Sequence, residues 1–405
     1  MEDKYNFSKL HNRNNTMSVK WDKCEEIFGK DDILPLWVAD SDWPTAPEIK
    51  AALINKAENG ILGYTFADQK VKTAVKNWLS KRFDLEIDKN WLVFDTGVVP
   101  AINFTLKAIT KAGDGVVIQP PVYRPFFSAV KNNDCELIKN SLVIKDRHYK
   151  IDFAGLEKII ADWKDKKGDI KALIFCSPHN PVGRVWKQSE LKRLIKILKR
   201  ENIYLLSDEI HSDLVYPAYD HYPSLKIIDD NPELEAYRKK IITYMAASKT
   251  FNIAGLHTSY TIISSDKLKR KYNRTKNGFS SGNSPFGLEA LKSAYNNGEK
   301  WLEEQLQYIV ENKNYLQNFI ENEIPAIKLF EQEGTFLIWL DCRDLNFEND
   351  QKLRKFMIEE AGVGLNPGIW FGKAGSGFMR LNIACPKKRL KTALIRIKNA
   401  VEKMA

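Results

Sequence analysis

Short apolar runs alternate with helical patterns in the middle of the chain, between residues 91 and 265. Most of these runs are continuously apolar rather than alternating in polarity, which is typical of strands buried on both faces of a sheet. The runs cover residues 116–119, 135–138, 172–176, 203–206, 241–245 and 259–263. This order predicts an α/β region in which helices cover a mostly parallel sheet.

Other patterns flank this region. Apolar residues at helical spacing begin at Pro47 and stop at Gly60, and residues 283–323 read as two helices with a break at Gly298. Beyond them we expect a strand at 335–340, a helix at 350–361, a loop at 362–377, a strand at 378–384 and an amphipathic helix from 387. The sequence therefore predicts a large domain at 46–298 and a smaller α+β domain formed by 1–45 and 299–405.

The composition supports two domains and limits the choice of partner. With 405 residues the chain exceeds one ordinary domain, and 43% hydrophobic and 28% charged residues are typical of a globular protein. Lys and Arg outnumber Asp and Glu by 62 to 52. The basic residues are spread over helical patterns, which favours solvated faces over a nucleic-acid surface. Residues 267–276 keep that alternative open, although no nucleic-acid-binding motif surrounds them.

The cysteines, the polar N-terminal residues and the lengths of the apolar runs bear on where the protein is expected. Five cysteines without a C-x-x-C spacing suggest neither a disulfide framework nor a metal site. The first 15 residues are polar and lack the apolar core of a signal peptide, and no run approaches the roughly 18 apolar residues of a membrane span. We therefore expect a cytoplasmic protein with no membrane attachment.

Lys249 follows a predicted buried strand and precedes a turn of small residues. Burial lowers the pKa of an ammonium group, and a neutral amine can condense with an aldehyde. Asn180 and Asp208 also lie at or just beyond the ends of predicted strands. In a parallel sheet, ligands collect beyond these carboxyl ends, so the three side chains are expected to meet.

An asparagine, a carboxylate, a lysine and an arginine in this order resemble the pyridoxal phosphate (PLP) site of the fold-type I aminotransferase superfamily. The resemblance implies that Lys249 carries the cofactor. A buried carboxylate such as Asp208 keeps the pyridine nitrogen protonated. The amide of Asn180 can donate a hydrogen bond to the phenolic oxygen of the ring.

Other residues meet the remaining demands of PLP and its substrate. Gly97, Val98 and Val99 precede the helical pattern at 101–112, and their backbone N–H groups suit a phosphate. Tyr123, held among prolines, offers a stacking face for the ring. Arg380 is a charge inside an apolar strand, which is costly unless an anion pairs with it. We expect that anion to be the substrate carboxylate, and an internal acid is the alternative.

Several longer motifs resemble the MalY/PatB subgroup of cystathionine β-lyases, which share this fold. They lie at residues 20–22, 34–40, 97–100, 121–123, 248–255 and 334–341. The resemblance implies α,β-elimination of cystathionine or related cysteine thioethers to thiol, pyruvate and ammonia. It adds Ala39 as a substrate contact, and His211 and Ser248 as cofactor contacts. It also implies a homodimer in which Tyr64 reaches the phosphate of the neighbouring subunit.

The chain departs from this subgroup at a few positions. Ser41 and Trp43 stand where methionine and phenylalanine are expected, and Ala247 replaces a proline. His257 occupies the position where many class I aminotransferases carry a phosphate-binding arginine, which favours a lyase. An aminotransferase remains the main alternative. A PLP protein that acts only through partners is the third, and the filled catalytic positions argue against it.

Overall fold

The computed structural model describes residues 5–280 and 282–404. Within these residues the largest sheet has seven strands in the order β2-β10-β9-β8-β7-β3-β4. β10 is antiparallel to both of its neighbours, and every other adjacent pair is parallel. The strands are β2 (Leu92–Asp95), β3 (Gly115–Ile118), β4 (Glu136–Lys139), β7 (Ile170–Cys176), β8 (Tyr204–Asp208), β9 (Ile241–Met245) and β10 (Ser259–Ile263). The predicted α/β fold with a mostly parallel sheet is confirmed.

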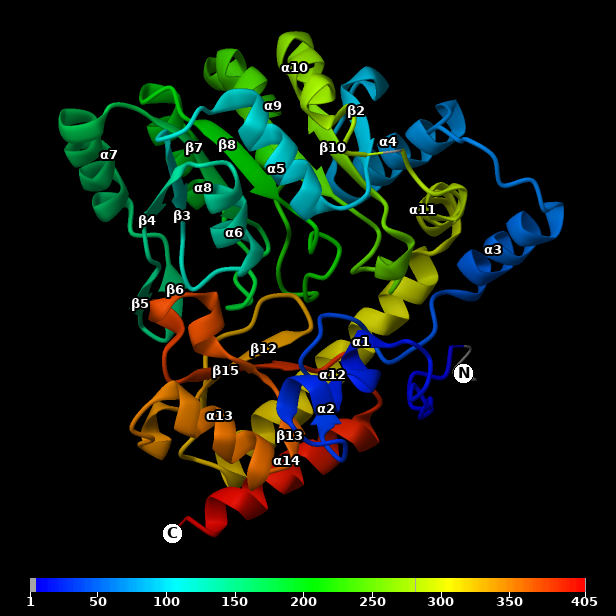
Figure 1. The fold of residues 1–405 in the computed structure, drawn as a ribbon, viewed down its shortest axis with the longest axis vertical. Coiled ribbons are helices and arrows are strands. Elements are labelled where there is room, and N and C mark those ends of the chain that lie inside the picture. The colour runs from blue at the N-terminus through cyan, green and yellow to red at the C-terminus, as the bar shows by residue number, and fades with distance from the viewer. Residues whose placement is uncertain (1–4, 281, 405) are drawn as a thin grey trace.

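Helices cover both faces of this sheet (Figure 1). Along β7, Ala172 and Ile174 pack into one apolar cluster with α5, α6 and α10, whereas Leu173 and Phe175 pack into another with α4, α8, α9 and α11. Alternate side chains therefore enter opposite layers, as the pleat of a strand requires. The helices are α3 (Pro47–Asn59), α4 (Gln69–Phe83), α5 (Val98–Ile109), α6 (Pro125–Asn132), α7 (Phe153–Lys167), α8 (Gln188–Arg200), α9 (Ser224–Asp229), α10 (Asp266–Lys276) and α11 (Pro285–Asn297).

A second, antiparallel sheet lies below the first in Figure 1. It consists of β11 (Lys328–Leu329), β12 (Leu337–Asp341), β15 (Phe378–Asn382) and β14 (Asn366–Pro367). The accompanying helices are α12 (Glu299–Glu323), α13 (Asp350–Glu359) and α14 (Lys387–Glu402). α12 runs from the upper part to the lower part, and the break predicted before it is confirmed at Gly298. The domain boundaries stay a prediction.

The N-terminal segment packs against the lower part. It contains α1 (Val19–Asp22), α2 (Cys24–Phe28) and β1 (Leu34–Pro35), and β1 pairs in parallel with β13 (Val363–Gly364). A hairpin of β5 (Val143–Lys145) and β6 (His148–Lys150) reaches toward the lower part from above. Short 3₁₀ turns cover Lys89–Trp91, Pro232–Lys240, Ala254–Leu256, Arg343–Leu345, Gly368–Phe371 and Lys373–Gly375.

A few predicted boundaries are wrong. The helix expected at 101–112 begins at Val98, because Pro100 lacks an N–H and fits the first turn of a helix. The strand expected from 335 begins at Leu337, since Thr335 has a positive φ of 67° that no regular strand adopts. The short strand β2 was not predicted as a strand.

The structure bears on two of the smaller sequence questions. All five cysteines are buried and unbonded to one another. In the described ranges, no helix is long and apolar enough to span a bilayer.

Candidate active site

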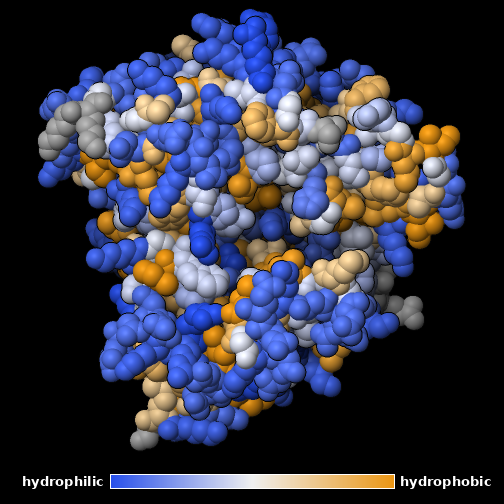
Figure 2. Space-filling view, in the orientation of Figure 1, coloured by the Kyte–Doolittle hydropathy of each residue, from blue (hydrophilic) through white to orange (hydrophobic). Residues whose placement is uncertain are grey.

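A cavity of about 620 Å³ lies between the two sheets, at the carboxyl ends of the parallel strands. At this level the surface is hollowed between the upper and lower parts of the molecule (Figure 2). Segments that follow β2, β7, β8 and β9 line it from above, and Arg380 on β15 lines it from below. The predicted site residues that line it are Ala39, Gly97, Val98, Val99, Tyr123, Asn180, Asp208, His211, Ser248, Lys249 and Arg380.

Lys249 lies in the turn after β9, and its Nζ donates a hydrogen bond to the carbonyl of Ala39 at 2.9 Å. Burial lowers the pKa of this amine, Arg380 lowers it further, and the negative charges of Asp40 and Asp208 oppose the shift. A lysine held in this way reaches its neutral, nucleophilic form more readily than an exposed one.

Asp208 is a buried carboxylate without an ion-pair partner in the described part of the chain. It is 3% exposed and accepts one hydrogen bond, from the N–H of Ile210 at 3.2 Å. Burial raises its pKa to about 7, and the nearby charge of Glu209 adds to the effect. A buried carboxylate that lacks a cation suits a ligand with a protonated ring nitrogen.

Arg380 is likewise a buried charge, and none of the described carboxylates pairs with it. Its Nη1 donates to Oδ1 of Asn180 at 2.9 Å, and its Nη2 donates to Trp37 and Asn366. Its Nε is buried without a partner among the described atoms, and burial lowers its pKa to about 10. The arginine is therefore positioned for an incoming anion.

The contact with Arg380 also orients Asn180. Because Oδ1 of Asn180 accepts from the guanidinium, its amide nitrogen is left as a hydrogen-bond donor at the cavity. This orientation fits the predicted contact with the phenolic oxygen of PLP.

The first turn of α5 and the ring of Tyr123 complete the wall. The N–H groups of Val98 and Val99 have no preceding turn of helix to bond to, so they can receive phosphate oxygens. Burial raises the pKa of Tyr123, so its phenol stays neutral beside the space for a ring. The donors, the aromatic face and the unpaired carboxylate together fit PLP.

Comparison with known proteins agrees with this site. The model of the family described as aminotransferase class I and II matches residues 32–397. The chain belongs to this family. It is 39% identical to cystathionine β-lyase PatB of Bacillus subtilis over 98% of this chain and 100% of that protein.

Solved structures of other proteins are similar to this chain. Cystalysin of Treponema denticola, which contains a pyridoxal 5′-phosphate cofactor, aligns with a TM-score of 0.92 at 36% identity and covers 99% of this chain and 100% of its own. The PLP-bound C–S lyase of Staphylococcus hominis aligns with a TM-score of 0.89 at 32% identity and covers 98% of both chains.

Tyr64 is the one predicted site residue that does not line the cavity of its own chain. It is fully exposed in the loop between α3 and α4, where Ile61, Leu62 and Phe66 are also exposed. Figure 2 shows hydrophobic surface at the edge of the molecule that this loop occupies. In this aminotransferase-family chain, Tyr64 therefore takes part in a site only if another subunit receives it.

Sequence reasoning missed three asparagines around the cavity. Asn366 accepts a hydrogen bond from Arg380, Asn382 lies two residues beyond Arg380, and Asn252 lies three beyond Lys249. Asn366 and Asn382 could have been predicted as site residues, because each is a polar residue in a buried strand. Asn252 has a positive φ of 56°, which a sequence pattern does not reveal.

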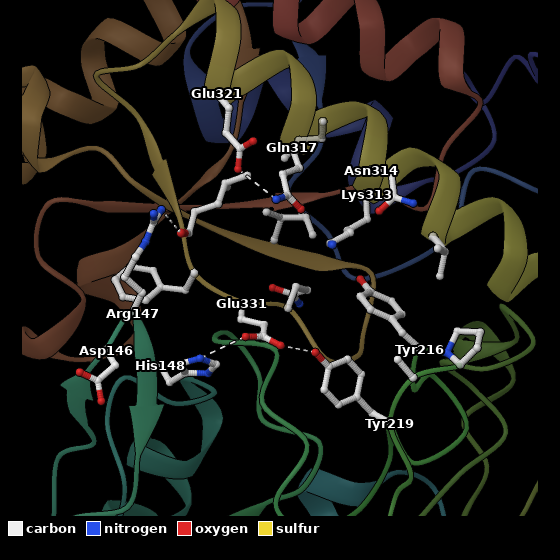
Figure 3. A pocket seen from close by; sticks show the side chains of 18 residues that line it. Asp146, Arg147, His148, Tyr216, Tyr219, Lys313, Asn314, Gln317, Glu321 and Glu331 are labelled. Carbon is white, nitrogen blue, oxygen red and sulfur yellow. Dashed lines mark hydrogen bonds and ion pairs between the residues drawn. The ribbon is translucent and has the colours of Figure 1, made fainter.

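A second cavity of about 700 Å³ lies between the β5–β6 hairpin, residues 216–219 and α12 (Figure 3). At its floor Glu331 accepts a hydrogen bond from the hydroxyl of Tyr219 and pairs with His148 at 3.1 Å. Arg147 donates to the carbonyl of Leu329. These contacts join the two parts of the chain, and the cavity offers no buried, unpaired nucleophile.

Proposed function

We propose that this chain is a PLP-dependent carbon–sulfur β-lyase acting on cystathionine or related cysteine thioethers. The observation that carries the proposal is end-to-end similarity to PatB, named as a cystathionine β-lyase, in a chain whose cavity brings Lys249, Asp208 and Arg380 together. The substrate class is small amino acids with a sulfur at Cβ. The absence of an arginine at His257 favours this reaction over amino transfer.

The cavity residues divide the tasks of holding the cofactor. Asp208 would hold the pyridine nitrogen, Asn180 the phenolic oxygen, the N–H groups of Val98 and Val99 the phosphate, and Lys249 the aldehyde carbon. Bound PLP supplies an electron sink that stabilises negative charge at the substrate Cα.

The remaining chemistry belongs to Arg380 and Lys249. Arg380 binds the substrate carboxylate and so fixes Cα relative to Lys249. Once the substrate amine has released Lys249, its Nζ removes the Cα proton as a general base. The electron pair left at Cα forms a double bond to Cβ as the thiolate departs, and water then completes the release of pyruvate and ammonia.

Product analysis tests this function. L-cystathionine or S-methyl-L-cysteine should give pyruvate, ammonia and thiol in equal amounts without a keto acid, because a thiolate is a good leaving group. L-serine should react poorly, since hydroxide leaves badly, and L-alanine should give pyruvate only when a keto acid is added. Lys249→Ala serves as the inactive control. Fast keto-acid-dependent transfer from alanine, with no thiol release from thioethers, would make the chain an aminotransferase.

We also propose that the active form is a homodimer with shared sites. The support is the exposed apolar loop at residues 61–66, where Ile61 is 76% and Phe66 80% exposed. Apolar side chains gathered on one exposed loop are typical of a surface that another protein covers. A second copy would bury this loop and bring Tyr64 to the phosphate of its neighbour.

A further inference from the structure

An irregular segment at residues 37–43, here called the strap, runs between β15 of the lower sheet and the turn that carries Lys249. Side chains from both sides hold the strap through its backbone carbonyls. Arg380 donates to the carbonyl of Trp37 at 2.9 Å, and Lys249 donates to that of Ala39 at 2.9 Å. The strap therefore forms a wall of the cavity and also supplies an acceptor to the lysine.

Asn382 holds the two carbonyls on either side of Ala39. Its Nδ2 donates to the carbonyl of Val38 at 2.6 Å and to that of Asp40 at 2.7 Å. Its own Oδ1 accepts from the N–H of Ala384 at 2.7 Å, which fixes the orientation of the amide. Since Val38 and Asp40 bond to one side chain on the β15 side, the carbonyl between them is directed toward Lys249.

Asn252 holds the far end of the strap. Its Nδ2 donates to the carbonyls of Ser41 at 3.0 Å and Trp43 at 2.7 Å, and its Oδ1 accepts from the N–H of Ser41 at 3.1 Å. Asn252 lies in the same turn as Lys249, so the lysine and the strap share one support.

A buried charge cluster fixes the strap from below. Asp42 is 1% exposed and pairs with Lys20 at 3.0 Å, with Arg13 at 2.9 Å and with Arg389. Burial opposes ionisation, but the charges of Lys20 and Arg389 outweigh it and lower the pKa of Asp42 to about 2. The cluster stays charged at neutral pH. Arg13 also donates to the carbonyl of Ser41 and Lys20 to that of Asp40, so the cluster supports the strap together with the asparagines.

We propose that Asn382 is a positioning residue for proton transfer by Lys249, acting through the carbonyl of Ala39. The Nζ atom that bonds to Ala39 is the atom that takes the Cα proton when the lysine is free. Asn382 touches neither substrate nor cofactor in this scheme. It fixes the acceptor that orients the lysine amine and receives its hydrogen bond, with Asn252 as a second support. The inference rests on the proposed role of Lys249 as the base.

The electrostatic surroundings predict a specific effect. The described charged and titratable groups around Lys249 are Asp40 on the strap, Arg380 on β15, Asp208 with His211 at and beyond the end of β8, and Tyr123, Cys176 and His257 in the cavity wall. A carbonyl that accepts a hydrogen bond from the ammonium form favours that form. Displacing Ala39 should therefore lower the pKa of Lys249, a change that general loosening of the fold would not produce.

The first test uses the full chain stripped of cofactor. The pH dependence of Lys249 acetylation, followed by peptide mass spectrometry, gives the titration midpoint of the amine. Asn382→Leu, which keeps the size of the side chain and removes both donors, should move this midpoint about one pH unit toward acid. Asn252→Gly keeps the positive φ without the amide and should move it in the same direction by less. Asn346→Gly, at an exposed asparagine with φ 57°, is the matched control and should not move it.

The second test uses the loaded enzyme and does not depend on elimination. Exchange of the L-alanine Cα proton with D₂O, followed by NMR, should slow at least about tenfold at saturating alanine in Asn382→Leu. The acid limb of the plot of exchange rate against pD should shift toward lower pD, with little change in KM. An unchanged midpoint and exchange rate in both variants, beside a lower Tm, would reduce both asparagines to structural residues. If wild type exchanges the proton but releases no thiol from thioethers, the lyase proposal fails and the positioning proposal stands.

Discussion

At the scale of single residues, the cavity holds two buried charges that the described part of the chain does not neutralise. Neither forms an ion pair there: Asp208 accepts from a backbone N–H, and Arg380 donates to amide and carbonyl oxygens. Burying an unpaired charge costs several kcal/mol in a folded protein, so such groups persist where a ligand completes them. The internal ion pair considered as an alternative for Arg380 does not occur among the described residues.

Asp208→Asn should stabilise the cofactor-free protein at neutral and alkaline pH. The folded-state pKa of Asp208, about 7, lies above the ordinary value of 3.8, so the stability it confers is fully present below about pH 4 and is lost as pH rises through 7. A pKa shift of this size corresponds to about 4 kcal/mol in the free energy of unfolding. Urea unfolding of both proteins between pH 4 and 8 should show the variant gaining on wild type as pH rises. A constant difference across this range would contradict the shift.

Arg380→Ala should raise KM for amino acids steeply. Loss of a buried charged contact costs roughly 2 to 5 kcal/mol, which is about 30-fold or more. Steady-state kinetics with L-cystathionine, and with the derivative whose α-carboxylate on the cleaved cysteine half is an amide, measure the change in KM. The amide should lose little, because it has no carboxylate to lose. Equal losses for acid and amide would show that Arg380 acts only by holding Trp37 and Asn180.

At the scale of elements, the sequence predicted the strands and helices that repeat a clear period and failed where backbone contacts decide. β9 was predicted at its true bounds, because all of its positions are buried and all but Thr243 are apolar. β2 was missed, although its four residues are as buried as those of β3, which was predicted. Residues 37–40 of the strap lie in one of the family motifs, but the strap is held through backbone carbonyls, which carry no sequence signal. Lys249 and Arg380 could be predicted as site residues from their own chemistry. Asn252 could not, because its role lies in contacts to backbone carbonyls.

Gly287→Ala should destabilise the protein although alanine is the better helix former. A Cβ at Gly287 in α11 would lie 2.7 Å from the carbonyl oxygen of Leu256 and even closer to Thr258 Oγ1. Overpacking of this kind typically costs 1 to 3 kcal/mol, more than the roughly 1 kcal/mol of helix propensity gained. Gly255→Ala, with no atom within 4 Å of the added carbon, is the control for thermal unfolding. An equal or higher Tm for Gly287→Ala would show that α11 shifts freely.

At the scale of the whole molecule, residues far apart in sequence meet in one cavity. Trp37 and Ala39 come from the N-terminal segment, Lys249 from the upper sheet and Arg380 from the lower one. A sequence pattern can select each residue, but it does not show that the N-terminal segment crosses the site. In the proposed dimer, the exposed loop with Tyr64 would extend the same arrangement to a second chain.

Mixing two inactive proteins tests the shared site. Tyr64→Ala combined with Lys249→Ala should recover activity, because a heterodimer holds one site with both lesions and one with neither. The recovered rate, measured as pyruvate release after subunit exchange, should be at most half that of a wild-type dimer per heterodimer formed. Each variant incubated alone is the control. If exchange occurs and no activity returns, Tyr64 does not serve the neighbouring site.

The way the strap is held also bears on how this enzyme can diversify. Asn382 and Asn252 bind the main chain of the strap, so the side chains of Val38 and Ser41 make none of the hydrogen bonds that hold it. Val38 lines the cavity, whereas Ser41 is buried and does not line it. Substitutions at Val38 can reshape the pocket while the Ala39 acceptor stays in place. A library randomised at this codon is therefore a direct route to new thioether preferences.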